Sequence, residues 1–209
     1  GHMSPGLPRD HVFRIETARL WLRWPRTADA PAIARQAGEK AVAEMTARIP
    51  VGMSAQDALA FVLGARQANA EGVGLYLAIT PKQRPNEAIG IVSVEPQGDR
   101  PPALGYWLAR EAWGGGLATE AAQAIVDATF GLTAARAIAA AVVPQNGASR
   151  AVLAKCGFAH AGGGLSAAPA RGGAQAVDFF RLDRSTWASL KGWREPRFRR
   201  DDQMMMAAQ

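Results

Sequence analysis

The amino-acid sequence predicts an α/β (α+β) fold in a single domain, with a mixed, mostly antiparallel central sheet of six to seven strands flanked by about four helices. Short apolar runs separated by turns of Pro, Gly and Asn are typical of a strand meander. Longer segments carry helix start signals and apolar residues at helical spacing. A chain of 209 residues with 48% hydrophobic residues is also long enough to bury a substantial core without disulfides.

The strands are recognised by their apolar runs. They are predicted at residues 19–24, 73–79, 88–94, 104–108, 136–144 and 177–182. The short links between the second, third and fourth of these runs predict antiparallel neighbours. Residues 161–175 are rich in Gly, Ala and Pro, and they are predicted to form a flexible loop.

The helices are recognised by their ends. They are predicted over residues 30–38, 55–69 and 118–130 and after Asn146. Thr27 or Asp29 is expected to cap the first helix, Ser54 the second and Asn146 the last. Gly157 followed by Phe158 predicts the end of the last helix, because a glycine tolerates the left-handed backbone there.

The chain is predicted to hold a cloning remnant and N-terminal lead at residues 1–15, one folded domain at 16–190 and a basic extension at 191–209. Nothing near the N-terminus resembles a signal peptide, and no stretch approaches the ~20 apolar residues that a membrane span needs. The single cysteine, Cys156, excludes an internal disulfide and is expected to be a buried packing residue. These features predict a cytoplasmic protein.

The formal net charge of +6 raises the question of nucleic-acid binding. The basic residues are nevertheless scattered, and the one dense run, at residues 191–200, is expected to be a solvated or loosely docked extension. Neither nucleic acid nor a membrane is therefore the expected partner. A modest positive field would instead attract an anionic ligand.

The most informative segment is a glycine-rich loop that follows a strand and opens directly into a helix. Gly114, Gly115 and Gly116 have no Cβ, so their backbone N–H groups can approach a ligand closely. The next helix adds unpaired N–H donors and the positive end of its dipole, which together suit a phosphate group. A plain structural turn is the alternative interpretation.

Two familiar phosphate loops do not fit this segment. It has no Gly-Lys-Ser/Thr ending, so the phosphate lysine and the metal-binding hydroxyl of a nucleotide loop are missing. Thr119 occupies the third glycine position of the dinucleotide fingerprint, and no strand ending in an acidic residue follows at the required distance. The loop therefore predicts a different phosphate-bearing ligand.

Four segments carry a family resemblance. They are Tyr106-Trp-Leu108, Trp113-Gly-x-Gly-Leu-Ala-Thr-Glu-Ala121, Asn146-x-x-Ser149 and Lys155-Cys-Gly-Phe158. In this order and spacing they resemble the Gcn5-related N-acetyltransferases (GNAT), in the branch of the ribosomal-protein N-terminal acetyltransferases (Rim type). Residues 16–23 resemble the opening strand of that branch and residues 179–187 its closing strand, so the resemblance covers residues 16–190.

The resemblance implies acetyl-CoA as cosubstrate, no metal, and direct transfer of the acyl group from a thioester to an amine. By position, the backbones of Leu108 and Arg110 would bind the pantetheine amides, and Asn146 would bind the cofactor arm. The pyrophosphate would lie on Gly114, Gly115, Gly116, Leu117, Ala118 and Thr119. For Asn146, a simple helix cap is an equally open interpretation.

Ser149 is the predicted catalytic residue, because in the resembling branch this hydroxyl lies where the departing thiolate forms. A helix-start serine that bonds its own backbone is the alternative. Many relatives carry a glutamate base where this chain has Ala103, which leaves Glu95, Tyr106 or a water molecule as candidates. A site without a strong base favours an α-amine of pKa ~7.8 over a lysine of pKa ~10.4.

The predicted function is therefore acetyl-CoA-dependent N-acetyl transfer to a primary amine, on a protein N-terminus or a small molecule. A non-catalytic acyl-CoA-binding or regulatory module on the same fold is the alternative, because Ala103 replaces the base. An RNA-associated protein that acts through the basic extension is a third, weaker hypothesis. The acceptor and the choice between monomer and homodimer stay open, although residues 46–52 and 161–175 are expected to shape the acceptor site.

Overall fold

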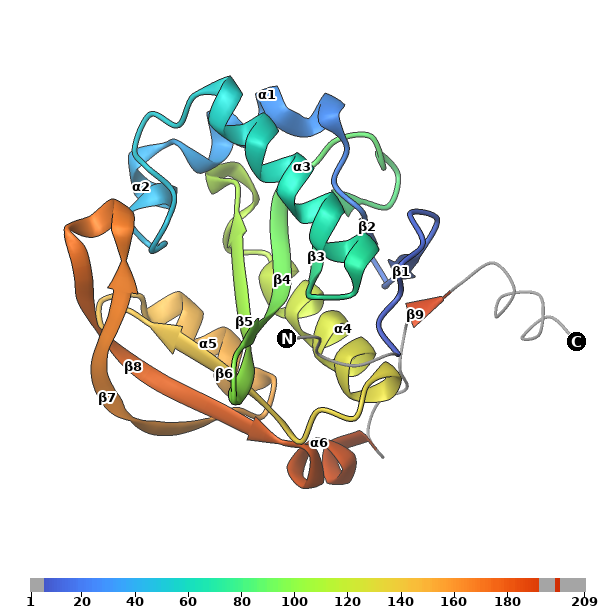
Figure 1. Ribbon diagram of the computed structural model, residues 1–209, viewed down its shortest axis with the longest axis vertical. Coiled ribbons are helices and arrows are strands. Elements are labelled where there is room, and N and C mark those ends of the chain that lie inside the picture. The colour runs from blue at the N-terminus through green and yellow to red at the C-terminus, as the bar shows by residue number, and fades with distance from the viewer. Residues whose placement is uncertain (1–5, 192–197, 200–209) are drawn as a thin grey trace, which may run out of the picture.

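One sheet organises the computed structural model, which describes residues 6–191 and 198–199 (Figure 1). Over these residues the sheet has nine strands in the order β7-β8-β6-β5-β4-β3-β2-β1-β9. Their bounds are β1 Arg14–Glu16, β2 Leu20–Arg23, β3 Leu75–Pro81, β4 Gly90–Gln97, β5 Arg100–Leu108, β6 Ala137–Val142, β7 Ala159–Ala168, β8 Gly173–Asp183 and β9 Phe198–Arg199. Every neighbouring pair is antiparallel except β5 and β6, which are parallel.

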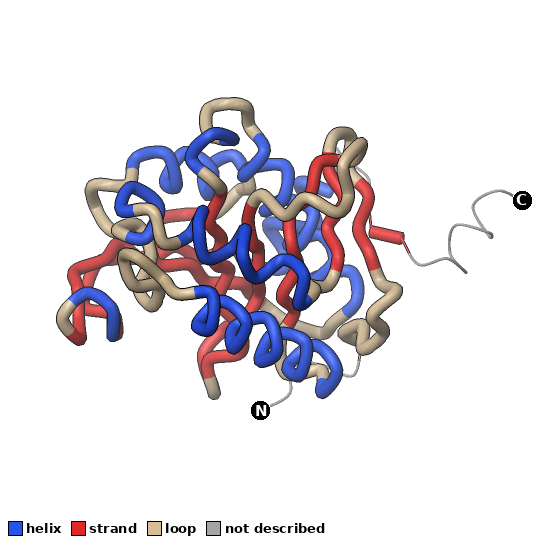
Figure 2. Tube along the Cα trace, turned by 90° about the horizontal axis from the view of Figure 1, so that it is seen from above, coloured by secondary structure: helices blue, strands red, loops and turns tan. Residues whose placement is uncertain are grey.

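Helices flank this sheet on both sides (Figure 2). In the described chain they are α1 Ala30–Ala37, α2 Lys40–Ala43, α3 Ala55–Glu71, α4 Leu117–Leu132, α5 Gly147–Lys155 and α6 Arg184–Lys191. The predicted mixed, mostly antiparallel sheet is confirmed. The described strands and helices outnumber the prediction. Strands β1 and β9 and helix α2 are too short to show an apolar period, and β7 and α6 were not predicted as separate elements.

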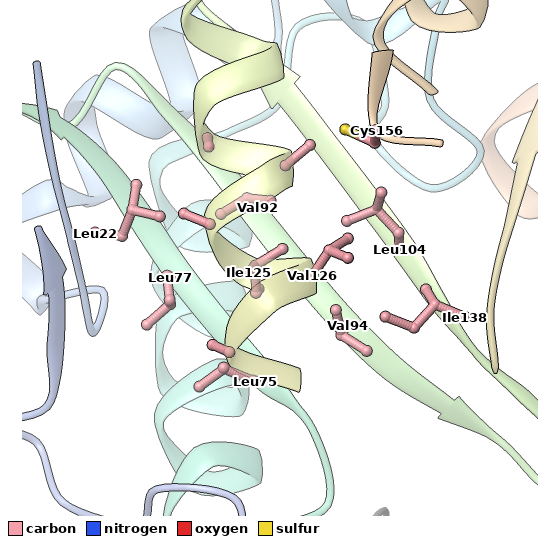
Figure 3. Close-up of a cluster of buried hydrophobic side chains, with 14 of the residues drawn as sticks. Leu22, Leu75, Leu77, Val92, Val94, Leu104, Ile125, Val126, Ile138 and Cys156 are labelled. Atoms are coloured by element: carbon pink, nitrogen blue, oxygen red, sulfur yellow. The ribbon is translucent and has the colours of Figure 1, made fainter. Parts of the chain in front are cut away.

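Two apolar clusters hold the helices on the sheet. On one face, Ile125 and Val126 of α4 pack with Val92, Val94 and Leu104 of the central strands (Figure 3). On the other face, α1 and α3 pack over Ile91 and its neighbours. Residues 91 and 92 are adjacent in β4 yet belong to different clusters, because successive side chains of a strand point to opposite faces.

The predicted flexible loop at residues 161–175 is wrong. This segment forms most of the β7–β8 hairpin, closed by a 3₁₀ turn at Pro169–Arg171 and by Gly172 and Gly173 with φ of 86° and 99°. Strand β7 lies at the sheet edge and is exposed along nearly its whole length, so its sequence has no alternation of buried and exposed residues. The amino-acid pattern of β7 therefore does not predict a strand.

The two terminal segments that the resemblance assigns to single strands need correction. Residues 16–23 are not one strand, because a turn separates β1 from β2 and the Thr17 backbone N–H donates to the Leu20 carbonyl (3.0 Å). Residues 179–187 are not one strand either. Strand β8 ends at Asp183, and α6 begins at Arg184, where the buried Trp187 indole N–H donates to Asp127 (2.8 Å).

The helix-end predictions are largely confirmed. Ser54 accepts the Asp57 backbone N–H (3.0 Å), and Asn146 accepts the Ser149 backbone N–H (3.1 Å). Gly157 has φ of 94° where α5 ends, as its sequence position predicts. The exception is Asp29, which occupies the cap position of α1 without a side-chain cap bond. Its carboxylate instead accepts two bonds from the buried Arg23 guanidinium (2.8 and 2.9 Å).

The termini add to the domain. Leu7 and Phe13 lie in the core, and β1 begins at Arg14, two residues before the predicted domain start. Strand β9 pairs with β1, so part of the predicted basic extension adds to the sheet. Residues 1–3, which are predicted to be a cloning remnant, lie outside the described residues, and so does the rest of the extension apart from Lys191 at the end of α6.

A charged contact between β1–β2 and α4 fixes the glycine-rich loop. Glu120, in the first turn of α4, accepts the Thr17 hydroxyl (2.5 Å), the Arg19 backbone N–H (2.8 Å) and the Arg19 Nε–H (2.9 Å). Arg19 Nη1 also donates to the Gly115 carbonyl (2.8 Å). Burial alone would raise the pKa of Glu120, but the bonds from Thr17 and Arg19 and the Arg19 charge hold that pKa below its ordinary value of 4.5.

We expect the contribution of this contact to depend on pH. Because the pKa of Glu120 is lower in the folded than in the unfolded protein, its stabilisation is present above the unfolded pKa and is lost as the pH falls through the folded pKa. Glu120→Gln should lower the free energy of unfolding by about 1–2 kcal/mol at neutral pH, and urea titrations should show a smaller difference from wild type toward pH ~3.

Glu87→Gln is the matched control, because Glu87 pairs with Arg84 across an exposed contact whose side chains are both 61% accessible. It should change the free energy of unfolding by less than ~1 kcal/mol at either pH. A penalty for Glu120→Gln that is equally large at neutral and acid pH would contradict this account.

Candidate active site

The C-terminal half of β5 leaves one backbone edge without a neighbouring strand. On the β6 side, the only registered pair in the described chain is Ala103 opposite Ala139. On the β4 side, the Ala109 N–H donates to the Ile89 carbonyl (2.8 Å), which fixes the odd-numbered residues of β5 as those bonded to β4. The backbone groups of Tyr106 and Leu108 therefore point toward the opening between β5 and β6.

Trp113 ties the end of β5 to the loop that follows. Its indole N–H donates to the Leu108 carbonyl (2.8 Å), and its backbone N–H donates to the Arg110 carbonyl (3.1 Å). The Arg110 side chain contacts Glu39 (3.1 Å). Both residues predicted to bind pantetheine thus lie beside the opening, but each carbonyl already accepts one bond from Trp113.

The glycine-rich loop is open and has a left-handed backbone at two of its glycines. Gly114 and Gly116 have φ of 83° and 81°, a conformation that side chains rarely adopt. A Cβ added at Gly114 or Gly115 would meet nothing within 4 Å, so the loop surface is open. Gly116 is the N-cap of α4 and supplies no side-chain cap, which leaves the first N–H groups of the helix available to a ligand. Leu117, Ala118 and Thr119 form that first turn.

Ser149 and Tyr106 meet on the α4–α5 side of β5. Their hydroxyl oxygens are 2.5 Å apart, and Asn146 fixes the start of α5 beneath Ser149. Burial raises the pKa of Tyr106 to about 12, although the bond with Ser149 acts in the opposite direction. Tyr106 is therefore neutral at physiological pH. The sequence placed Tyr106 in the strand core, and the structure adds this polar contact to its packing.

The opposite face of the same strands carries a carboxylate. Glu95 of β4 lies directly opposite Ala103, and Ser93 lies opposite Gly105. Glu95 contacts the Ser93 hydroxyl (3.5 Å) and the Arg48 guanidinium (3.5 Å). Glu95 is one of the three candidate bases predicted from the sequence, and only the strand register shows that it lies opposite Ala103.

The two segments expected to shape the acceptor site lie in contact. Ala170, at the tip of the β7–β8 hairpin, donates its backbone N–H to the Ala47 carbonyl (3.0 Å). Arg171 donates to the Ile49 carbonyl (2.5 Å). Arg48 belongs to the same 46–52 segment and reaches Glu95, so this segment joins the hairpin to the carboxylate.

Sequence reasoning missed Thr17, Arg19 and Arg48. The first two contact Glu120 across more than 100 positions of the chain, and no local pattern signals such a contact. Within residues 6–191 and 198–199, no group of His, Cys, Asp and Glu side chains is arranged to hold a metal ion. Over the same residues, no helix combines the length and the apolarity needed to cross a membrane.

Comparison with known proteins gives the family. The sequence model of the GNAT acetyltransferase domain matches residues 19–159. The uncharacterized protein YkkB of Bacillus subtilis is 36% identical over 95 residues, which are 44% of this chain and 55% of YkkB. The chain therefore spans just over half the length of that curated relative.

The fold is shared with solved acetyltransferase structures. RimJ of Mycobacterium smegmatis, in complex with CoA-disulfide, is 24% identical with a TM-score of 0.70, over 87% of this chain and 92% of that one. Ribosomal-protein-S5-alanine acetyltransferase of Vibrio fischeri is 22% identical with a TM-score of 0.70, over 83% and 98%. Because the sequence model of the GNAT acetyltransferase domain covers more than half of the chain, the chain belongs to the GNAT acetyltransferase family.

Proposed function

We propose that this protein is a cytoplasmic, acetyl-CoA-dependent N-acetyltransferase that acts directly on a primary amine, on a protein N-terminus or a small molecule. The observation that carries the proposal is the open glycine loop at the start of α4, beside the unpaired half of β5. A similar fold was solved with acetyl-CoA and AMP in the microcin C7 self-immunity protein MccE, at 17% identity and a TM-score of 0.67.

In this proposal the cosubstrate follows the backbone from β5 to α4. Leu108 and Arg110 bind the pantetheine arm through their N–H groups and the second lone pairs of their carbonyls, since Trp113 takes the first. The pyrophosphate lies on the N–H groups of residues 114–119. Asn146 keeps its cap bond to Ser149, and its side chain contacts the same arm.

Tyr106 and Ser149 act on the leaving group. Acetyl-CoA supplies a thioester, whose thiol has a pKa near ~8.5 once released. A proton transfer from Tyr106 at a pKa of about 12 would be uphill by roughly 5 kcal/mol, so the pair stabilises the thiolate by hydrogen bonding rather than as a general acid. Tyr106 donates to Ser149, which frees the Ser149 O–H to donate to sulfur.

Binding of the cosubstrate is tested by isothermal titration with acetyl-CoA and CoA. Gly116→Trp places a bulky side chain at φ of 81° in the loop, and it should weaken binding about 100-fold or more. Gly64→Trp in α3 is the matched control, because a Cβ there meets nothing within 4 Å and the residue lies outside the loop, and it should leave Kd within about twofold. Folded wild-type protein that binds neither compound would overturn the proposed function.

Leaving-group stabilisation is tested by a double-mutant cycle on kcat, measured as thiol release. Tyr106→Phe and Ser149→Ala should each lower kcat about 10- to 100-fold while the Kd for CoA stays constant. The double variant should lose little more than Ser149→Ala alone, because the two hydroxyls act as one unit. Losses that multiply would show that the two hydroxyls act independently. Tight CoA binding without any turnover in wild type would instead favour the non-catalytic module.

A further inference from the structure

Glu95 lies one strand away from the position where relatives carry their base. Glu95 and Ala103 are directly opposite in the β4–β5 ladder, so their side chains leave the sheet on the same face with Cβ atoms about 5 Å apart. The β4 register shifts just after Glu95, between Glu95 and Gln97, and such a bulge re-aims side chains locally. A carboxylate at position 95 of β4 can therefore reach the space that a side chain at position 103 of β5 would reach.

Small residues separate Glu95 from the opening between β5 and β6. Ala103 is paired with Ala139 where that opening begins, and Gly105 follows on the same face. A Cβ added at Gly105 would lie 3.4 Å from the hydroxyl of the buried Ser93, so the missing side chain leaves room beside that hydroxyl. An amine at the opening meets no bulky β5 side chain at positions 103 and 105 on its path to Glu95.

The surroundings of Glu95 suit an approaching cation. Its side chain is 33% accessible, and the neighbouring Arg48 is 75% accessible, so this ion pair is open to solvent and easily exchanged. Tyr76, opposite Ser93 on β3, faces the same carboxylate. Burial, and then the neighbouring Glu95 carboxylate, raise the pKa of Tyr76, so the phenol stays neutral. Ser93 completes the contacts.

We infer that Glu95 binds the acceptor amine and takes its proton, in place of the glutamate that Ala103 replaces; this inference rests on the proposed function. The amine nitrogen forms the new C–N bond to the acyl carbon, and the C–S bond breaks with its electron pair leaving on sulfur. The arriving ammonium loses one proton before the attack and a second after it. Each proton passes to a Glu95 oxygen, directly or through one water molecule, and from there to solvent, which in turn protonates the released thiolate. Arg48 gives way as the ammonium group arrives.

The test transfers the carboxylate from position 95 of β4 to position 103 of β5, directly opposite. Thiol release from acetyl-CoA is measured with two acceptors, tri-alanine and 1,4-diaminobutane, for wild type, Glu95→Gln and Glu95→Gln/Ala103→Glu. We expect Glu95→Gln to lower kcat/KM at least 100-fold, within the range of proton-transfer catalysis, and the double variant to recover to within about tenfold of wild type. The Kd for CoA should stay constant throughout. Glu87→Gln, on the β3–β4 connection, is the matched control and should retain full activity.

The outcomes separate the two proposals. A wild-type protein that acetylates an acceptor while Glu95→Gln retains its rate would overturn the role of Glu95 and leave the transferase intact. If Glu95→Gln loses activity and the added Ala103→Glu does not restore it, the role of Glu95 is also overturned. That result would show a carboxylate that is needed for structure at position 95, since a base could act from β5 as well. A wild-type protein that transfers to neither acceptor would overturn the proposed function, and this inference with it.

Discussion

The active-site architecture depends on one constraint, the single parallel pairing among the described strands, whose other pairings are all antiparallel. Parallel neighbours require a crossover, and here the crossover from β5 to β6 is the glycine-rich loop and α4. The crossover places the N-terminus of α4 at the C-terminal end of β5, where the pairing with β6 has already stopped. Backbone donors of the strand and of the helix therefore lie at one opening.

The strand alternation then divides the chemistry between two faces. Even-numbered residues of β5 face α4 and α5, where Tyr106 meets Ser149. Odd-numbered residues face α1 and α3, where Ala103 and Gly105 lie opposite Glu95 and Ser93. In the proposed reaction, sulfur is stabilised from one face and the amine proton leaves toward the other. A shift of one residue in the register would exchange these faces and separate both groups from the opening.

Local signals in the sequence predicted much of this frame. Ser54, Asn146 and Gly157 marked helix ends because capping depends on residues within one turn. The glycine-rich loop was also visible, because its three glycines and the start of the next helix are consecutive in the sequence. Strand β7 and the start of β8 were missed, since an edge strand exposed on both faces has no apolar period. The position of Glu95 opposite Ala103 depends on strand register, and neither residue signals it alone.

The central claim is that the backbone of the β5 end and of the α4 start binds the cosubstrate. Hydrogen–deuterium exchange with and without CoA tests it most directly, amide by amide. The account predicts slower exchange on CoA binding at the amides of residues 106–108 and 114–119, with no change along the exposed edge strand β7. Protection absent from residues 114–119, or found only elsewhere in the protein, would contradict it.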